Sequence, residues 1–383
     1  MPQPSILTID IGTGTQDVYL LRAGLSPENG FKLVMPSATM AIRRLIQQAT
    51  RRGDAILLEG VTMGGGPCAW AAEDHVRAGG LLYATPAAAR TFNDDLDQVQ
   101  REMGVRLVSE DEAGRLRDVT RIPLRDVDPD ALRAAFAAFG VELQPSAVGL
   151  AVFDHGAAPA GTSDRQFRFD YLAERIRREN RLSAFAYPAA EVPPSLTRLQ
   201  AVAQSAASFD APLVVMDTAP AAVLGALLDS RIEPEARRMV VNIGNFHALA
   251  FRLGPGGIEG VFEHHTGLLD RPRLEAFLRA FAAGDLTHQA VFDDMGHGAL
   301  ILDPTPLPLD AGGSPFTVTG PRRAMLSGSD LRPIFAAPFG DMMLAGCFGL
   351  LQAMADHLAE FATLLRDSLL GQPSDRAPWD VES

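Results

Sequence analysis

Residues 6–21 read ILTIDIGTGTQDVYLL, and this stretch decides the fold. Its first half is apolar up to Asp10, a Gly/Thr turn follows, and an apolar run resumes at Val18. Two apolar runs separated by a glycine-rich turn predict two strands of one hairpin. We expect Gly12 and Gly14 to supply the positive φ that a tight turn needs.

The turn has the chemistry of a phosphate-holding loop. Thr13 and Thr15 offer hydroxyls, the backbone offers N–H groups, and the carboxylate of Asp10 can hold a hydrated magnesium ion. The alternative is a hairpin turn without a ligand, because short glycine motifs recur by chance.

Composition restricts the class of protein. The chain has 383 residues, of which 47% are hydrophobic and 21% charged, as in globular proteins of more than one domain. A net charge of −13 argues against a nucleic-acid partner or an anionic membrane surface. No uncharged apolar run reaches the length of a membrane span, and no signal-type segment precedes the first strand. We therefore expect a soluble, cytoplasmic protein.

Alternating patterns along the chain predict an α/β fold. Strand-like and helix-like segments alternate through the first 110 residues, and residues 114–130 are charged and irregular, as in a connecting segment. Residues 240–251, VVNIGNFHALAF, repeat the form of the opening stretch. We expect two such hairpins to face each other across a cleft.

Five ordered segments resemble the plan of the superfamily of actin, sugar kinases and heat-shock chaperone ATPases. They correspond to a first phosphate hairpin, a connecting helix, a second phosphate hairpin, an adenosine-side turn and a second connecting helix: residues 6–21, 214–229, 240–251, 316–323 and 340–353. The resemblance implies a two-lobed actin-like ATPase fold made of duplicated ribonuclease H-like domains, with the nucleotide between the lobes. It assigns residues 1–235 and 340–383 to the first lobe, with inserted segments, and residues 236–339 to the second.

The chain is most similar to a prokaryotic family labelled as pyruvate formate-lyase activating enzymes, through the segments DIGTGTQD, MGGGP, DHG, NIGNFH, EHHTG, GHG and TGPRR. The label does not fit as a reaction, because a radical-SAM activase needs three clustered cysteines and this sequence has only Cys68 and Cys347. We expect both to be buried, inert thiols. Some ATPases of the superfamily bridge an iron–sulfur cluster between subunits with two cysteines from each, which is the alternative.

The resemblance also implies roles for individual residues. Asp10 would orient Mg²⁺ through water, and Asp217 would orient or deprotonate an attacking water or hydroxyl. The residues expected to hold ATP are Gly12, Thr13, Gly14, Thr15, Gly244 and Asn245 at the phosphates and Thr319, Gly320 and Arg322 at the nucleoside.

The second phosphate hairpin departs from the superfamily pattern. Many members have aspartate at its start, whereas this chain has Asn242. Asparagine can bind a metal-bound water but removes one negative charge near Mg²⁺. Weaker metal binding, slow turnover or a nucleotide-sensing role would follow, unless Asn242 only caps the turn.

Histidines and arginines in the remaining polar loops are candidates for binding a second metal or an acidic substrate. The histidines are His155, His264 and His265, with His75, His247 and His297 in the other polar segments, and the arginines are Arg165 and Arg168. The alternatives are histidines bonded to backbone and a solvated arginine pair at a helix start. No H-x-x-x-H or H-x-H spacing favours the metal.

The sequence thus supports three functions. The first is a Mg-ATP-binding protein that hydrolyses ATP or transfers its phosphoryl group to a small-molecule or protein acceptor that the sequence does not identify. The second is a nucleotide-dependent switch or interaction protein with little catalysis. The third, which is weaker, is a metal-dependent hydrolase that uses the histidine-rich loops. The oligomeric state is not defined by any of these patterns.

Overall fold

The computed structural model of the protein describes residues 4–159, 161–233, 236–309, 315–371 and 376–380. Its first sheet is built on the opening hairpin, with the strand order β3-β2-β1-β8-β10-β9. β1 pairs antiparallel with β2 and parallel with β8, and β10 continues the parallel side. The strands are β1 (Ser5–Ile11), β2 (Thr15–Arg22), β3 (Phe31–Pro36), β8 (Ala147–Val152), β9 (Ala186–Pro188) and β10 (Leu213–Asp217).

The second sheet repeats this plan with the order β14-β13-β12-β11-β15-β16. β11 pairs antiparallel with β12 and parallel with β15. The strands are β11 (Arg238–Ile243), β12 (His247–Gly254), β13 (Gly257–His265), β14 (Gly298–Ile301), β15 (Phe316–Thr319) and β16 (Ile334–Phe335). Each sheet therefore contains a three-stranded antiparallel meander whose first strand pairs with a parallel strand, as expected for duplicated units.

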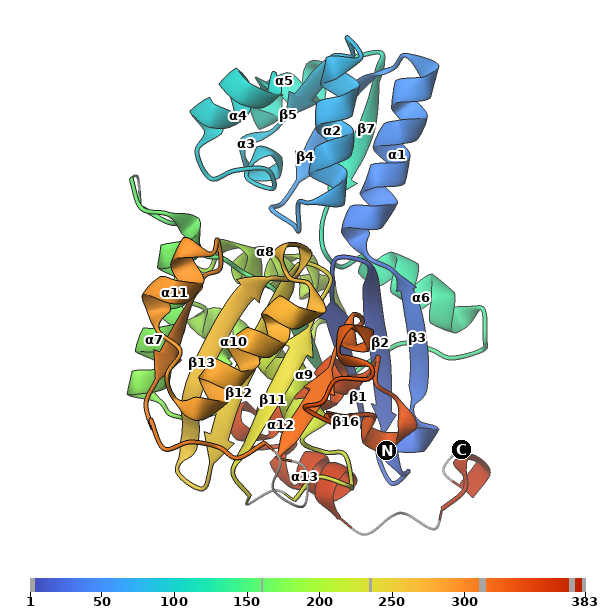
Figure 1. The fold of residues 1–383 in the computed structure, drawn as a ribbon. Helices are drawn as coiled ribbons and strands as arrows, with labels where there is room; N and C mark the ends of the chain where they lie inside the picture. Colours follow the sequence, from blue (N-terminus) through green and yellow to red (C-terminus); the bar gives the residue numbers. More distant parts are fainter. Residues whose placement is uncertain (1–3, 160, 234–235, 310–314, 372–375, 381–383) are drawn as a thin grey trace.

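A smaller, parallel sheet with the order β6-β5-β4-β7 is inserted between β3 and β8. Together with its helices it forms a unit that stands apart at the top of Figure 1. Its elements are α1 (Ala38–Arg52), β4 (Ala55–Gly60), α2 (Pro67–Arg77), β5 (Leu82–Ala84), α3 (Pro86–Ala89), α4 (Leu96–Met103), β6 (Arg106–Leu107), α5 (Glu110–Arg115) and β7 (Val119–Leu124).

The expectation that residues 114–130 are irregular is wrong. They contain β7, an edge strand that pairs with β4 along its whole length. Pro123 and the charged residues around the strand hide its short alternating pattern, in which Ile122 and Leu124 are buried. An edge strand tolerates proline because one side of its backbone needs no partner.

The other helices lie around the two large sheets: α6 (Pro129–Ala137), α7 (Asp164–Arg178), α8 (Thr197–Ser205), α9 (Thr218–Ala226), α10 (Arg271–Ala283), α11 (His288–Asp293), α12 (Ala345–His357) and α13 (Ala362–Leu370). Among the described residues, none of the helices has the length and apolar character needed to cross a membrane. The lobe boundaries 1–235, 236–339 and 340–383 stay a prediction. Residues 1–3, 160, 234–235, 310–314, 372–375 and 381–383 within those ranges lie outside the described residues.

Helices α9 and α12 cross at very short range in the middle of the molecule (Figure 1). A β-carbon added at Gly225 would lie 1.6 Å from the carbonyl oxygen of Ala345, and one added at Gly349 would lie 1.8 Å from that of Ala221. Only glycine allows backbones to approach in this way. Gly225 and Gly349 therefore bring the backbones of α9 and α12 into direct contact.

We expect Gly349→Ala to lower the free energy of unfolding by at least about 1–3 kcal/mol, because the added methyl group overlaps the backbone of α9 and the two helices must separate. The gain in helix propensity, about 1 kcal/mol, does not offset this cost. Urea unfolding measures the difference. Gly114→Ala is the matched control, since a β-carbon at this helical position in α5 meets nothing within 4 Å. Equal stability of the two variants would contradict the argument.

Candidate functional site

The turns of the two hairpins have the same hydrogen bond. The N–H of Gly12 donates to the carbonyl of Thr15 at 2.9 Å, and the N–H of Gly244 donates to that of His247 at 2.9 Å. His247 thus occupies the position in the second turn that Thr15 occupies in the first. The duplication seen in the sheets extends to the turns.

Positive φ is not the reason for the glycines in the first turn, and that prediction is wrong. Neither Gly12 nor Gly14 is among the residues with positive φ. Glycine is favoured at both positions because a larger residue would be too close to its neighbours. A β-carbon on Gly14 would lie 2.9 Å from Nδ2 of Asn245, and one on Gly12 would lie 3.2 Å from the carbonyl oxygen of Thr15. The tips of the two hairpins therefore meet directly.

A cavity of ≈ 440 Å³ lies where the hairpins meet. Its lining includes most of the residues predicted to hold a nucleotide: Gly12, Thr13, Thr15, Asn242, Gly244, Asn245, Thr319 and Gly320. Gly14 touches Asn245 beside this lining. Arg322 is not part of the lining; its backbone N–H donates to the carbonyl of Ile243 at 3.0 Å and so holds the adenosine-side turn against the second hairpin.

Two buried carboxyl groups face each other at the base of the cavity. Asp10 and Asp17 are directly opposite across the first hairpin, and both line the cavity. Burial raises the pKa of Asp10 to about 7, opposed by the hydrogen bond from Thr218 and assisted by the charge of Asp217. Burial and then the charge of Asp10 raise the pKa of Asp17 to about 8. Each of the two carboxyl groups therefore opposes ionisation of the other.

The surroundings of Asp10 are built around its carboxylate. Thr218, the first residue of α9, donates its hydroxyl to Oδ1 of Asp10 at 2.5 Å. A β-carbon at Gly346 would lie 1.8 Å from Oδ2, so α12 can lie this close to Asp10 only with glycine at this position. Oδ1 of Asp17 has no hydrogen-bond partner. The side chain of Asp10 is thus fixed by a hydrogen bond, whereas one carboxylate oxygen of Asp17 receives none.

The structure places Asp217 in a buried ion pair. Its Oδ2 accepts a hydrogen bond from Arg168. Its Oδ1 accepts one from the N–H of Ala219 at 3.1 Å, so Asp217 is the N-cap residue of α9. Arg168 also contacts Glu263, 3.3 Å from Nε to Oε2, and burial raises the pKa of Glu263 to about 7. Asp217 is 1% exposed and does not line the cavity.

Two of the other predicted substrate residues have internal partners. Arg165 donates to the carbonyls of Phe292 and Gly296 at 3.1 and 2.5 Å, and Nε2 of the buried His264 lies 3.0 Å from Oδ2 of Asp294. Neither residue lines the cavity, and Arg168 is enclosed as described.

Other predicted histidines do come together near the cavity. His155 and His247 line it, and the ring of His265 lies 5.0 Å from that of His247 and 4.6 Å from that of His297.

The inserted unit supplies a third wall. The loop Met63–Gly66 lines the cavity, and a β-carbon on Gly66, whose φ is +62°, would lie 2.6 Å from the ring of Phe246 in the second hairpin. Asp126 accepts from the N–H of Gly64 at 3.2 Å and from Arg198 at 2.8 and 3.0 Å. The loop therefore lies close to the second hairpin at Gly66 and to Asp126 at Gly64.

Several residues of the site are not predicted from the sequence, and some carried a signal. Asp17 follows from the register, because a hairpin closed between Gly12 and Thr15 puts it opposite Asp10. Thr218 sits beside the predicted Asp217, whereas the pair of Asp126 with Arg198 is formed by segments far apart and had no local signal.

The repeated sheets and the facing hairpins define the class: this is a two-lobed α/β protein of the actin-like ATPase fold. A family model described as "Putative pyruvate format-lyase activating enzyme (DUF1786)" matches residues 63–325, more than half of the chain. The chain belongs to this family. Within the described residues Cys68 and Cys347 lie in different hydrophobic cores, so they do not form a radical-SAM cluster.

Both thiols are buried, as expected, and burial raises the pKa of Cys68 to about 11. Low-pKa, exposed thiols are the reactive ones. Neither cysteine therefore has the environment of a reactive or metal-binding thiolate.

Solved structures resemble the chain only distantly. The ethanolamine utilization protein EutJ from Carboxydothermus hydrogenoformans is 12% identical, with 91% of this chain and 90% of that chain covered and a TM-score of 0.31. The ROK hexokinase from Thermus thermophilus is 13% identical, with 94% of this chain and 78% of that chain covered and a TM-score of 0.22. The Ppx/GppA family member from Aquifex aeolicus is 11% identical, with 73% of this chain and 60% of that chain covered and a TM-score of 0.20. Similarity at this level says nothing about activity. No curated protein matches the sequence.

Proposed function

We propose that the protein binds Mg-ATP in the cavity, with the phosphates between the two hairpin turns. The observation that carries the proposal is the meeting of Gly14 and Asn245 over a cavity whose base holds Asp10 and Asp17. Paired carboxylates with raised pKa values are stabilised by a hard divalent cation, and magnesium bound to phosphates keeps waters that such carboxylates can hold. Thr319 and Gly320 are on the side of the nucleoside.

The chemistry that this site would support is ATP hydrolysis or phosphoryl transfer, since positioning and charge neutralisation supply most of the catalysis in such reactions. The acceptor would be water, a small molecule or a protein. His155 lines the cavity and is uncharged at neutral pH, because burial lowers its pKa to about 3. It is a candidate for contacting the acceptor.

A nucleotide-dependent switch with little catalysis is the second candidate. Asn242 puts an amide where the resemblance predicts a carboxylate, and Asp217 is engaged by Arg168 and the cap of α9. With both groups removed from the phosphate side, turnover would be slow while binding persists. The release of phosphate from ATP by the wild type separates the two candidates.

We expect Mg-ATP to raise the Tm of the wild type by several °C at concentrations about 100-fold above Kd, where the added stability is about 2.7 kcal/mol. Asp10→Asn should abolish the shift, because the amide cannot balance the charge of Mg²⁺. ATP with EDTA should give a much smaller shift. Asp367→Asn on α13, which removes an exposed carboxylate outside the cavity, is the control and should retain it. Absence of a shift with Mg-ATP and other nucleotides would refute the proposal.

A further inference from the structure

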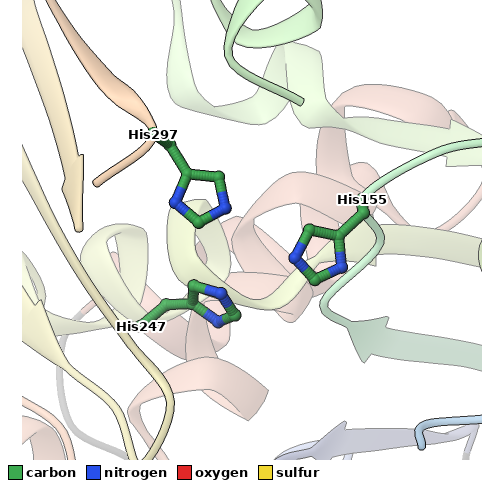
Figure 2. Close-up of side chains that lie close together, drawn as sticks. All are labelled: His155, His247 and His297. Atoms are coloured by element: carbon green, nitrogen blue, oxygen red, sulfur yellow. The ribbon is translucent and has the colours of Figure 1, made fainter. Parts of the chain in front are cut away.

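Three histidines converge at one end of the cavity from three separate segments. His155 follows β8 in the first large sheet, His247 begins β12, and His297 directly precedes β14. Figure 2 shows the three rings turned toward one another. One nitrogen from each ring lies within 4.8 Å of the others, and no other group of three or more metal-ligating side chains is this close within the described residues.

Three ring nitrogens of this cluster are buried without a hydrogen-bond partner among the described residues. Nε2 of His247 and both nitrogens of His297 are buried without a hydrogen bond, and His297 is 0% exposed. Buried polar atoms are nearly always hydrogen-bonded, and leaving one unsatisfied costs about 1–3 kcal/mol. A neutral imidazole has one lone-pair nitrogen, so His247 and His297 can each offer one to a ligand such as a metal ion.

Charged side chains also lie near the cluster. The positive charge of Arg168 is balanced by Asp217 and Glu263, and Oε1 of Glu263 has no partner. Arg168 therefore does not add a net positive charge beside the cluster.

Phe153 fixes one of the rings. Its ring stacks on that of His247 with centroids 4.0 Å apart and an interplanar angle of 5°, and it also contacts the ring of His155 at 4.7 Å. His265 approaches His297 to 4.6 Å between centroids without belonging to the group of three. The cluster is thus packed on its outer sides and open toward the cavity that His155 and His247 line.

We propose that His155, His247 and His297 bind one divalent transition-metal ion, with zinc as the first candidate, and that a further coordination position faces the cavity. At Zn–N distances of about 2.0–2.1 Å, tetrahedral ligands are roughly 3.3–3.4 Å apart, so the rings need to move together by about 1.5 Å at most. Imidazole ligands suit zinc, iron, nickel and copper, whereas Mg²⁺ takes oxygen ligands. This site is therefore distinct from the Asp10–Asp17 pair.

The metal would join the two lobes. His155 belongs to the first lobe, and His247 and His297 belong to the second. His247 also closes the turn of the second hairpin through its carbonyl, which accepts from Gly244. An ion held here would lie beside the hairpin turn and could take a water or an anionic oxygen from the cavity in its open position. The inference does not depend on nucleotide binding.

The site is tested by titrating Co²⁺ into tag-free protein from which metals have been removed with EDTA. Absorption spectroscopy monitors the titration. We expect one equivalent of Co²⁺ to give the intense visible bands of a four-coordinate ion, one equivalent of Zn²⁺ to displace it, and the protein as isolated to contain a transition metal by elemental analysis. His155→Ala should weaken Co²⁺ binding at least about 100-fold, since even the loss of residues that only orient ligands costs 10–100-fold.

His297→Gln is the second variant and should also weaken Co²⁺ binding. Because His297 is buried, its replacement can affect folding, so circular dichroism must first show that the variant is folded. His265→Gln, a neighbour outside the group of three, and His288→Gln, which pairs with Gln166 away from the cavity, should bind Co²⁺ as the wild type does. Stoichiometric binding that is unchanged in His155→Ala, or the absence of four-coordinate Co²⁺ bands in the wild type, would overturn the assignment. Loss of binding in His265→Gln alone would also overturn it. Failure of Mg-ATP binding would leave all these results unaffected.

Discussion

Asp17→Asn is expected to raise the Tm of the ligand-free protein at pH 8 and to abolish its response to Mg-ATP. The pKa of Asp17 is raised to about 8 by burial and by the charge of Asp10, so the folded state keeps a proton that the unfolded state releases. Between about pH 4 and pH 8 the folded protein binds more protons than the unfolded chain, and stability falls as the pH rises through this window. The substitution removes this loss.

The expected gain at pH 8 in EDTA is on the order of 2–5 kcal/mol, because one unit of pKa shift corresponds to about 1.4 kcal/mol and Asp10 shares the effect. Thermal unfolding of wild type and variant at pH 5 and pH 8 measures it. The two proteins should be similar at pH 5 and differ at pH 8. A variant that is less stable than the wild type at pH 8, or equally pH-dependent, would refute the argument.

The functional part of this prediction has the opposite sign. A bound Mg²⁺ would attract both Asp10 and Asp17 and so offset their mutual repulsion, and the wild type is then expected to gain stability from Mg-ATP where the variant does not. The same substitution would thus stabilise the empty protein and remove the ligand response. Asp367→Asn again serves as the control, and a full Mg-ATP shift in Asp17→Asn would exclude Asp17 from the magnesium site.

The second large effect concerns Arg168, which is 0% exposed and contacts both Asp217 and Glu263. Arg168→Met is expected to lower the free energy of unfolding by about 3–5 kcal/mol at pH 7, because two buried carboxylates lose their counterion. The loss should be smaller at pH 5, where Glu263, whose pKa is already about 7, is protonated. Urea unfolding at both pH values measures the difference.

Two further variants make this prediction specific. Arg177→Met, on the exposed side of the same helix, should change stability by no more than about 0.5 kcal/mol. Adding Glu263→Gln to Arg168→Met should recover part of the loss, because the uncompensated charge is then removed. A loss that is independent of pH and of Glu263→Gln would mean that the packing of Arg168, rather than its charge, stabilises the fold.

Much of the fold is predictable because its signals are local. The hairpin at residues 6–21 and its repeat at residues 240–251 each contain their own apolar runs and turn, and the sheets confirm both. β7 is not predictable in this way, because its only signal is two buried residues around Pro123. The need for glycine in the first turn is not a local property either, because at Gly14 it comes from contact with a hairpin far away in the sequence.

The site is predictable only in part. Residues within the two hairpin turns could be named from the sequence, since the turns themselves place them. The meeting of His155, His247 and His297 depends on three loops brought together by the packing of the lobes, and no spacing in the sequence encodes it. The sequence likewise does not indicate that Arg168, a predicted substrate residue, and Asp217, a predicted catalytic residue, are bonded to each other in the fold, because 49 residues separate them.

The contact between α9 and α12 has a mechanical consequence. The chain leaves the first sheet for the second through α9 and returns to pack on it through α12, so both passages between the lobes lie at one place. Sliding of the lobes would pull Gly225 and Gly349 away from the carbonyls they touch, whereas rotation about the helix pair would preserve these contacts. We therefore expect any opening of the cavity to be a rotation about α9 and α12, with displacements that grow with distance from this axis.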